Sequence, residues 1–187
     1  GLIGPNGAGK STLFDVITGY YQPEAGDITF ENHHLVGRRP DQVNRLGIGR
    51  TFQKLRPFHA MTVLENITVA AMQHEVKPAA ARQEALRYLE VVELADKRDS
   101  YARELSTGQR KRLELARAMA TRPRLLLLDE VTGGVDQRTI PTLVQLIGRL
   151  RDQGLTLVVI EHNMRVIMSI ADRIVALHLG EVIADGP

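Results

Sequence analysis

Apolar positions along this chain follow two patterns, one typical of buried strands and one typical of amphipathic helices. Short apolar or alternating runs predict strands at 2–3, 27–30, 47–52, 125–128 and 155–160, and a last long strand at 173–179. Apolar residues at helical spacing predict helices over 11–18, 139–151 and 163–170. The run at 125–128 is continuously apolar, as expected for a strand whose sheet is covered on both faces. This alternation predicts an α/β fold with a mostly parallel sheet.

The stretch 58–121 has a purely helical pattern. Segments 62–65 and 106–109 each place Ser or Thr three residues before Glu or Gln, which is the spacing of a capping box at a helix start. Pro78 suits the first turn of a helix between them. The sequence therefore predicts a helical subdomain inserted into an α/β core. The predicted core consists of residues 1–57 and 122–187, and the predicted subdomain of residues 58–121.

Composition narrows the class of protein. Of 187 residues, 43% are apolar and 25% are charged, as in ordinary globular domains. The net charge of +2 is not the footprint of a nucleic-acid-binding protein, so we expect no nucleic-acid partner. There is no cysteine, which excludes disulfides and cysteine metal sites, and the longest apolar runs are too short to span a bilayer. Because Leu2 and Ile3 resemble the end of a strand, we expect further N-terminal strands to be missing from this sequence.

A glycine-rich loop follows the first predicted strand and precedes the first helix. It matches the phosphate-binding pattern in which glycines let successive N–H groups point at phosphate oxygens. Lys10 would contact the β- and γ-phosphates, the Ser11 hydroxyl would ligate Mg²⁺, and Thr12 would reach another phosphate oxygen. A chance match is expected in under about one chain in a hundred of this length. The candidate phosphate ligands are Gly4, Pro5, Asn6, Gly7, Ala8, Gly9, Lys10, Ser11 and Thr12.

Polar residues follow three later strands directly, where ligands of open parallel sheets bind. Asp129 is a candidate Mg²⁺ ligand, and Glu130 is a candidate base that orients the attacking water. Taken alone, the pair could equally be surface carboxylates in a turn. Gln53 could contact Mg²⁺ or the water, or simply end its strand. His162 is a candidate γ-phosphate contact, although a lone histidine is more often structural.

The segment 106–109 has a structural explanation and a functional one. Helix capping fully explains Ser106 and Gln109. It does not explain Gly108, because glycine in a first turn costs up to about 1 kcal/mol of helix stability. A glycine at this position would let a phosphate approach the helix N-terminus closely.

The order of these motifs, together with residues 134–136, resembles the ATP-binding cassette (ABC) family over the whole chain. The resemblance implies a P-loop NTPase fold of the RecA-like type, with ATP and Mg²⁺ as ligands. It also implies that cassettes pair head to tail. Ser106, Gly108 and Gln109 of one subunit would then close on the γ-phosphate held by the other, with residues 133–136 across the seam.

Within the family, segments 47–53, 61–66 and 161–165 look like the ATPase subunits of branched-chain amino acid importers. This implies an ATPase at the cytoplasmic face of the cell membrane, bound to transmembrane permease subunits and to a second, identical or related cassette. Its cargo would be branched-chain amino acids or similar small polar solutes. The sequence departs from the family pattern at Thr107, Val131 and Val135, none of which is a catalytic group.

Three other classes of cassette protein share parts of this motif pattern. Cassettes of lipid-export systems look similar. A cytosolic cassette acting on ribosomes is also compatible with the motifs. DNA-repair and chromosome-organising cassettes insert long coiled coils, whereas only 51 residues lie between Gln53 and Leu105 here and they contain no heptad run, so this class is rejected.

Overall fold

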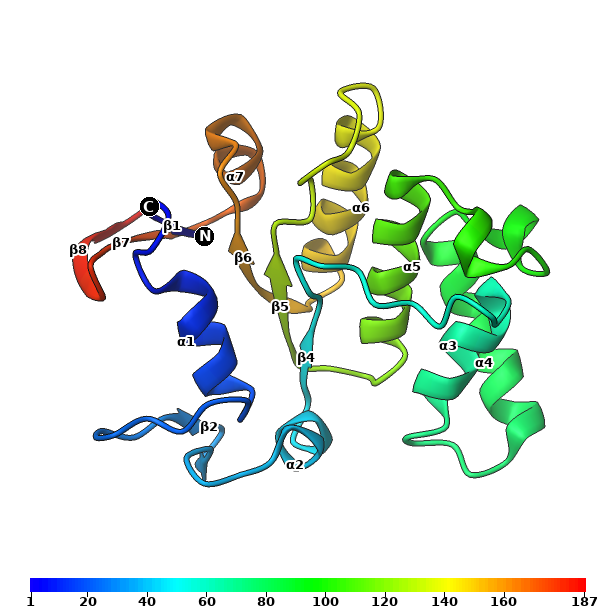
Figure 1. Ribbon diagram of the computed structural model, residues 1–187, viewed down its shortest axis with the longest axis horizontal. Helices are drawn as coiled ribbons and strands as arrows, with labels where there is room; N and C mark the ends of the chain where they lie inside the picture. Colours follow the sequence, from blue (N-terminus) through cyan, green and yellow to red (C-terminus); the bar gives the residue numbers. More distant parts are fainter.

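The computed structural model describes all residues, 1–187, and is built around a six-stranded sheet (Figure 1). The strand order is β4-β5-β6-β1-β7-β8, in which every neighbouring pair is parallel except β7 and β8. This confirms the predicted mostly parallel sheet. Its strands are β1 (Leu2–Ile3), β4 (Ile48–Arg50), β5 (Leu125–Asp129), β6 (Thr156–Ile160), β7 (Ile174–His178) and β8 (Glu181–Gly186).

Helices cover both faces of the sheet. Successive side chains of β5 point to opposite faces: Leu126 and Leu128 join the larger apolar core, whereas Leu127 packs with Phe14 and Val43 in a smaller one. The apolar run at 125–128 is therefore buried on both sides, as its pattern predicts. The elements of these layers are α1 (Lys10–Ile17), α2 (Pro40–Arg45), α6 (Ile140–Asp152) and α7 (Met164–Ile170), beside a small hairpin of β2 (Thr29–Phe30) and β3 (His33–His34).

The segment between β4 and β5 is helical. It contains α3 (Val63–Ala71), α4 (Pro78–Val91), two single 3₁₀ turns, η1 (Ala95–Lys97) and η2 (Ala102–Glu104), and α5 (Thr107–Met119). Both predicted capping boxes form. Thr62 Oγ1 accepts a hydrogen bond from the Glu65 amide at 3.2 Å, and the Glu65 carboxylate accepts one from the Thr62 amide at 2.7 Å.

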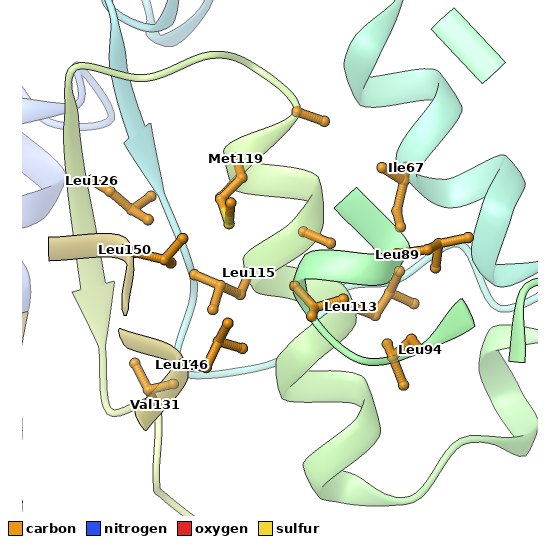
Figure 2. Packing of buried hydrophobic residues seen from close by; sticks show 14 of the residues in the cluster. Ile67, Leu89, Leu94, Leu113, Leu115, Met119, Leu126, Val131, Leu146 and Leu150 are labelled. Carbon is orange, nitrogen blue, oxygen red and sulfur yellow. The ribbon is translucent and has the colours of Figure 1, made fainter. Parts of the chain in front are cut away.

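Helix α5 joins this helical segment to the sheet. Figure 2 shows Leu113 on the side of α5 that faces Leu89 and Leu94, while Leu115 lies on the opposite side with Leu146. All of these side chains belong to one continuous apolar core. Because protein interiors are close-packed, the position of α5 is fixed relative to β5 and α6. This matters for the site, since residues 106–109 start α5.

The structure differs from the sequence prediction at the C-terminal end. The strand at 173–179 is not the last one: β7 ends at His178, and β8 folds back against it. Leu179 and Gly180 both have positive φ, 48° and 84°, which is the geometry of a tight two-residue hairpin turn. The pattern also missed α2 and β3. None of the helices combines the length and apolar character needed to cross a bilayer.

Candidate functional site

The glycine loop connects β1 to α1 and leaves the start of that helix open. A Cβ on Gly4 would lie 2.2 Å from the carbonyl oxygen of Leu177, so no larger residue fits there. Gly7 and Gly9 have φ of 79° and 98°, a region that glycine adopts without strain. Gly9 is the N-cap of α1, and no side chain caps the helix. The first N–H groups of α1 are therefore available to an anion.

Lys10 is buried and folds back over its own loop. Its Nζ donates hydrogen bonds to the carbonyl oxygens of Gly4, at 2.8 Å, and Pro5, at 3.0 Å. The ammonium group is thus held at the concave side of the loop. This position is suited to a phosphate contact.

Two adjoining clefts contain most of the predicted site residues. One, of about 330 Å³, has Gln53, Glu130 and His162 facing the glycine loop. The other, of about 350 Å³, has Asp129 and Arg50 in its wall, and Ser11 and Gln53 line both clefts. The loop residues of the first cleft are Asn6, Gly7, Ala8, Gly9, Lys10, Ser11 and Thr12.

The Glu130 carboxylate contacts both of the side chains that face the glycine loop with it in the first cleft. Gln53 Nε2 donates to its Oε2 at 2.8 Å, and His162 Nε2 lies 2.9 Å from its Oε1. Each oxygen of the carboxylate thus has a partner from a different strand end. Its backbone is in the left-handed region, with φ of 48°. Such a conformation costs about 1 kcal/mol or more for a residue with a side chain.

Asp129 lies next to this residue and is almost completely buried. Its Oδ2 is 3.4 Å from the Arg50 guanidinium, whereas its Oδ1 is buried with no hydrogen-bond partner. Burial raises the pKa of the Asp129 carboxyl, and Arg50 partly offsets that rise. An orphaned carboxylate oxygen in a cleft shared with the Ser11 hydroxyl is a donor set that suits a hard cation such as Mg²⁺.

Arg50 is a site residue that the sequence reasoning missed. It projects from β4 with only 7% of its side chain exposed and pairs with Asp15 of α1 at 2.6 Å as well as with Asp129. Its guanidinium also lies 5.0 Å from the Phe52 ring centre and 5.6 Å from that of Phe14. It therefore connects α1 to β5 in the wall of the second cleft. A charged residue inside a predicted buried strand was the available signal, because such a charge needs partners.

Replacement of Arg50 by methionine is expected to destabilise the fold by about 3 kcal/mol, because breaking a buried ion pair leaves the carboxylates of Asp15 and Asp129 without their cation. Urea unfolding followed by circular dichroism measures this. Arg45→Met is the matched control, since its side chain is 71% exposed and we expect a change within about 0.5 kcal/mol. A loss below about 1 kcal/mol for Arg50→Met would contradict the assigned role.

Ser106, Gly108 and Gln109 do not line either cleft of their own chain. Ser106 and Gln109 form the predicted capping box, with the Ser106 amide donating to Gln109 Oε1 at 2.9 Å. Gly108 has a reason that the sequence did not reveal: a Cβ there would lie 2.8 Å from Thr139 Cγ2. A larger residue at this position would therefore require the Thr139 side chain to shift.

Comparison with known proteins identifies the family. The family model described as "ABC transporter" matches residues 1–133. The chain belongs to the ABC transporter family. As a member of that family it is an ATP-binding, ATP-hydrolysing cassette.

Individual relatives narrow the comparison. This ABC cassette is 40% identical over 201 residues to the high-affinity branched-chain amino acid transport ATP-binding protein BraF of Pseudomonas aeruginosa, covering 99% of this chain and 79% of that protein. It is 39% identical over 202 residues to LivG of Escherichia coli K12, a protein of the same description, with the same coverage.

Solved structures agree with the fold. A nucleotide-free ATP-binding cassette from an ABC transporter superposes with a TM-score of 0.88 at 32% identity, covering 99% of this chain and 78% of that one. An ABC cassette in its ADP conformation gives a TM-score of 0.87 at 33% identity, with the same coverage. These matches confirm the P-loop NTPase fold.

Proposed function

We propose that this ABC cassette hydrolyses Mg²⁺-ATP with Glu130 as the general base, and that it powers a membrane importer together with a second cassette. The catalytic part of this proposal rests on one observation. Gln53 and His162 both contact the Glu130 carboxylate, in the cleft that the glycine loop also lines. Phosphoryl transfer requires positioning and charge more than covalent chemistry, and this arrangement supplies both.

The residues have distinct tasks in this proposal. Loop N–H groups and Lys10 bind the β- and γ-phosphates, and Thr12 contacts a further phosphate oxygen. Glu130 accepts a proton from the attacking water while Gln53 and His162 hold its carboxylate in place. His162 lines the same cleft as the loop, which supports its assignment as a γ-phosphate contact.

Ser11, Asp129 and Gln53 would hold Mg²⁺. The buried, unpartnered Asp129 Oδ1 and the Ser11 hydroxyl line one cleft, and Gln53 uses its Nε2 on Glu130, which leaves its amide oxygen for the cation. Bound there, Mg²⁺ would supply positive charge against the phosphate oxygens.

A second cassette would complete the site. Ser106 is exposed at the start of α5, outside the cleft of its own chain. It is therefore free to meet the nucleotide of a partner, with Gly108 and Gln109 beside it. A dimeric bacterial ABC transporter cassette superposes on this chain with a TM-score of 0.87 at 30% identity over 98% of it and 82% of that chain, which supports pairing.

The transported solute and the membrane partner follow from the relatives. BraF and LivG are described as branched-chain amino acid transport proteins, so we propose branched-chain amino acids as cargo and permease subunits as partners at the cytoplasmic face of the membrane. The surface that follows Gln53 is suited to receive the permease, since Phe58 and Met61 are exposed there.

Transport itself tests this proposal. Reconstitution with the permease subunits encoded beside its gene, in vesicles with ATP on the cassette side, is expected to give uptake of labelled leucine at least about tenfold above that of the Glu130→Gln complex. A lipid-export cassette would move labelled lipid and no leucine. Wild-type ATP turnover without any leucine uptake would contradict the assigned cargo, and a cassette that does not bind the permease would contradict the transport role.

A further inference from the structure

Lys111 is a buried cation that the site description leaves unused. It lies in the second turn of α5 with 5% of its surface exposed. Its Nζ donates a 2.6 Å hydrogen bond to the backbone carbonyl oxygen of Glu130. The bond runs from the helix that starts at residues 106–109 to the turn that carries the candidate base.

The contact acts on a strained piece of backbone. Glu130 is left-handed, with φ of 48°, and its amide donates to the Ile160 carbonyl at 3.0 Å. Its carbonyl oxygen accepts from the Gly133 amide at 3.1 Å in addition to Lys111. A charged donor makes a stronger hydrogen bond than a neutral one. Lys111 therefore stabilises the conformation that points the Glu130 carboxylate at Gln53 and His162.

The start of α5 and the segment that follows Glu130 pack as one unit. Gly108 lies so close to Thr139 that a Cβ on it would displace the Thr139 side chain, and Val135 is its next neighbour. Gly134 lies beside the Thr107 methyl group. A displacement of residues 106–109 would therefore move Lys111 and, through its hydrogen bond, the backbone of Glu130.

We propose that Lys111 is a positioning residue that couples the two ATP sites of the cassette pair. This inference rests on the proposed function, in which Ser106, Gly108 and Gln109 contact the partner's nucleotide. When that nucleotide fixes the start of α5, Lys111 fixes the peptide of Glu130 and aims its carboxylate at the water of its own site. Closure at one site thus orders the base of the other.

A merely structural role for Lys111 makes a different prediction. Its buried ammonium group is also attracted by the carboxylates of Glu161, Glu130, Asp129 and Glu114. If it only balanced these charges, its replacement would lower stability without a specific effect on turnover. The two roles are distinguished by whether the substitution changes kcat without changing KM. Both constants are measured well below the temperature at which the variant unfolds.

The test compares ATP turnover of wild type, Lys111→Met and Lys111→Gln in full chains, with Lys77→Met as the control, since Lys77 is exposed. Lys111→Met is expected to lower kcat about tenfold or more with KM for ATP within about twofold, because ATP binding does not use this residue. Lys111→Gln keeps an N–H donor but loses the charge that strengthens the bond and part of the reach, so its kcat should fall less, by about three- to tenfold. If Lys111→Met does not fold, a folded Lys111→Gln with lower kcat at unchanged KM supports the proposal.

A kcat within twofold of wild type in Lys111→Met, or in Lys111→Gln where only that variant folds, would overturn the proposal. So would a fall in kcat that is matched by a rise in KM. Failure of the proposed function gives another result: wild type would not hydrolyse ATP, or Glu130→Gln would hydrolyse it at the wild-type rate. If wild type is active, Glu130→Gln is inactive and Lys111→Met is fully active, the proposed role of Lys111 is wrong and the proposed function still holds.

Discussion

Replacement of Glu130 by glutamine is expected to lower ATP turnover by roughly 10²- to 10⁴-fold, the range that removal of a general base produces. Affinity for ATP should stay within about threefold of wild type. Glutamine has the size of glutamate and keeps an oxygen that can accept the hydrogen bond from Gln53, so the cleft keeps its shape. It cannot accept a proton from water. Phosphate release measures the first effect, and equilibrium binding of a fluorescent ATP analogue measures the second.

The matched control is Glu181→Gln, because Glu181 is exposed on β8 and lies outside both clefts. It should hydrolyse ATP at the wild-type rate. In the proposed cassette pair, Glu130→Gln should also remain dimeric with ATP, since the nucleotide that holds the subunits together is not consumed. Size-exclusion chromatography with light scattering detects this. Turnover by Glu130→Gln above about a third of the wild-type rate would remove this residue from the role of base.

The sequence predicted the cluster of candidate site residues through a property of parallel sheets. Glu130 directly follows β5, while Gln53 and His162 come within three residues of the ends of β4 and β6, and the carboxyl ends of parallel strands share one edge of the sheet. In the structure these three side chains meet by hydrogen bonding although they lie 32 and 77 residues apart along the chain. Polarity at strand ends was enough to predict the cluster, because the topology brings such positions together whatever the intervening segments contain.

Supporting contacts were not predictable in this way. Arg50 and Asp129 are 79 residues apart, and Lys111 reaches the carbonyl oxygen of a residue 19 positions later. Neither pair follows from a local pattern, since a side chain's partner depends on how helices and strands pack. The packing of Gly108 against Thr139 could not be predicted either, because the two residues are neighbours only in the folded chain.

The elements that the pattern missed are those with little burial. Strand β8 is almost entirely exposed, so its side chains show no alternation between apolar and polar positions. Helix α2 buries only Val43, which gives no helical periodicity in six residues. By contrast, α5 was predicted at its start by capping, although it is buried on nearly all sides and rich in charge. The spacing of its capping residues was sufficient to predict that start, without a pattern of apolar positions.

Replacement of Lys10 by alanine is expected to lower the affinity for ATP by about 10- to 150-fold, since a hydrogen bond to a charged group contributes roughly 1.5–3 kcal/mol. Turnover should fall below detection, because the γ-phosphate loses its point charge. The structure also limits the effect on affinity. Lys10 Nζ donates to the carbonyl oxygens of Gly4 and Pro5, so contacts of Lys10 with phosphate compete with these two bonds.

Those two bonds give the variant a second, separable effect. In wild type Lys10 stabilises the loop by donating hydrogen bonds to two of its carbonyl oxygens. In Lys10→Ala the loop loses this cation, so its backbone amides should exchange hydrogen faster than those of wild type when no ATP is added, while α5 stays protected. Hydrogen exchange measured with and without ATP distinguishes loop stabilisation from nucleotide binding. Lys77→Ala, an exposed control, should change neither quantity. Wild-type ATP affinity in Lys10→Ala would show that the glycine loop binds phosphate through its backbone alone.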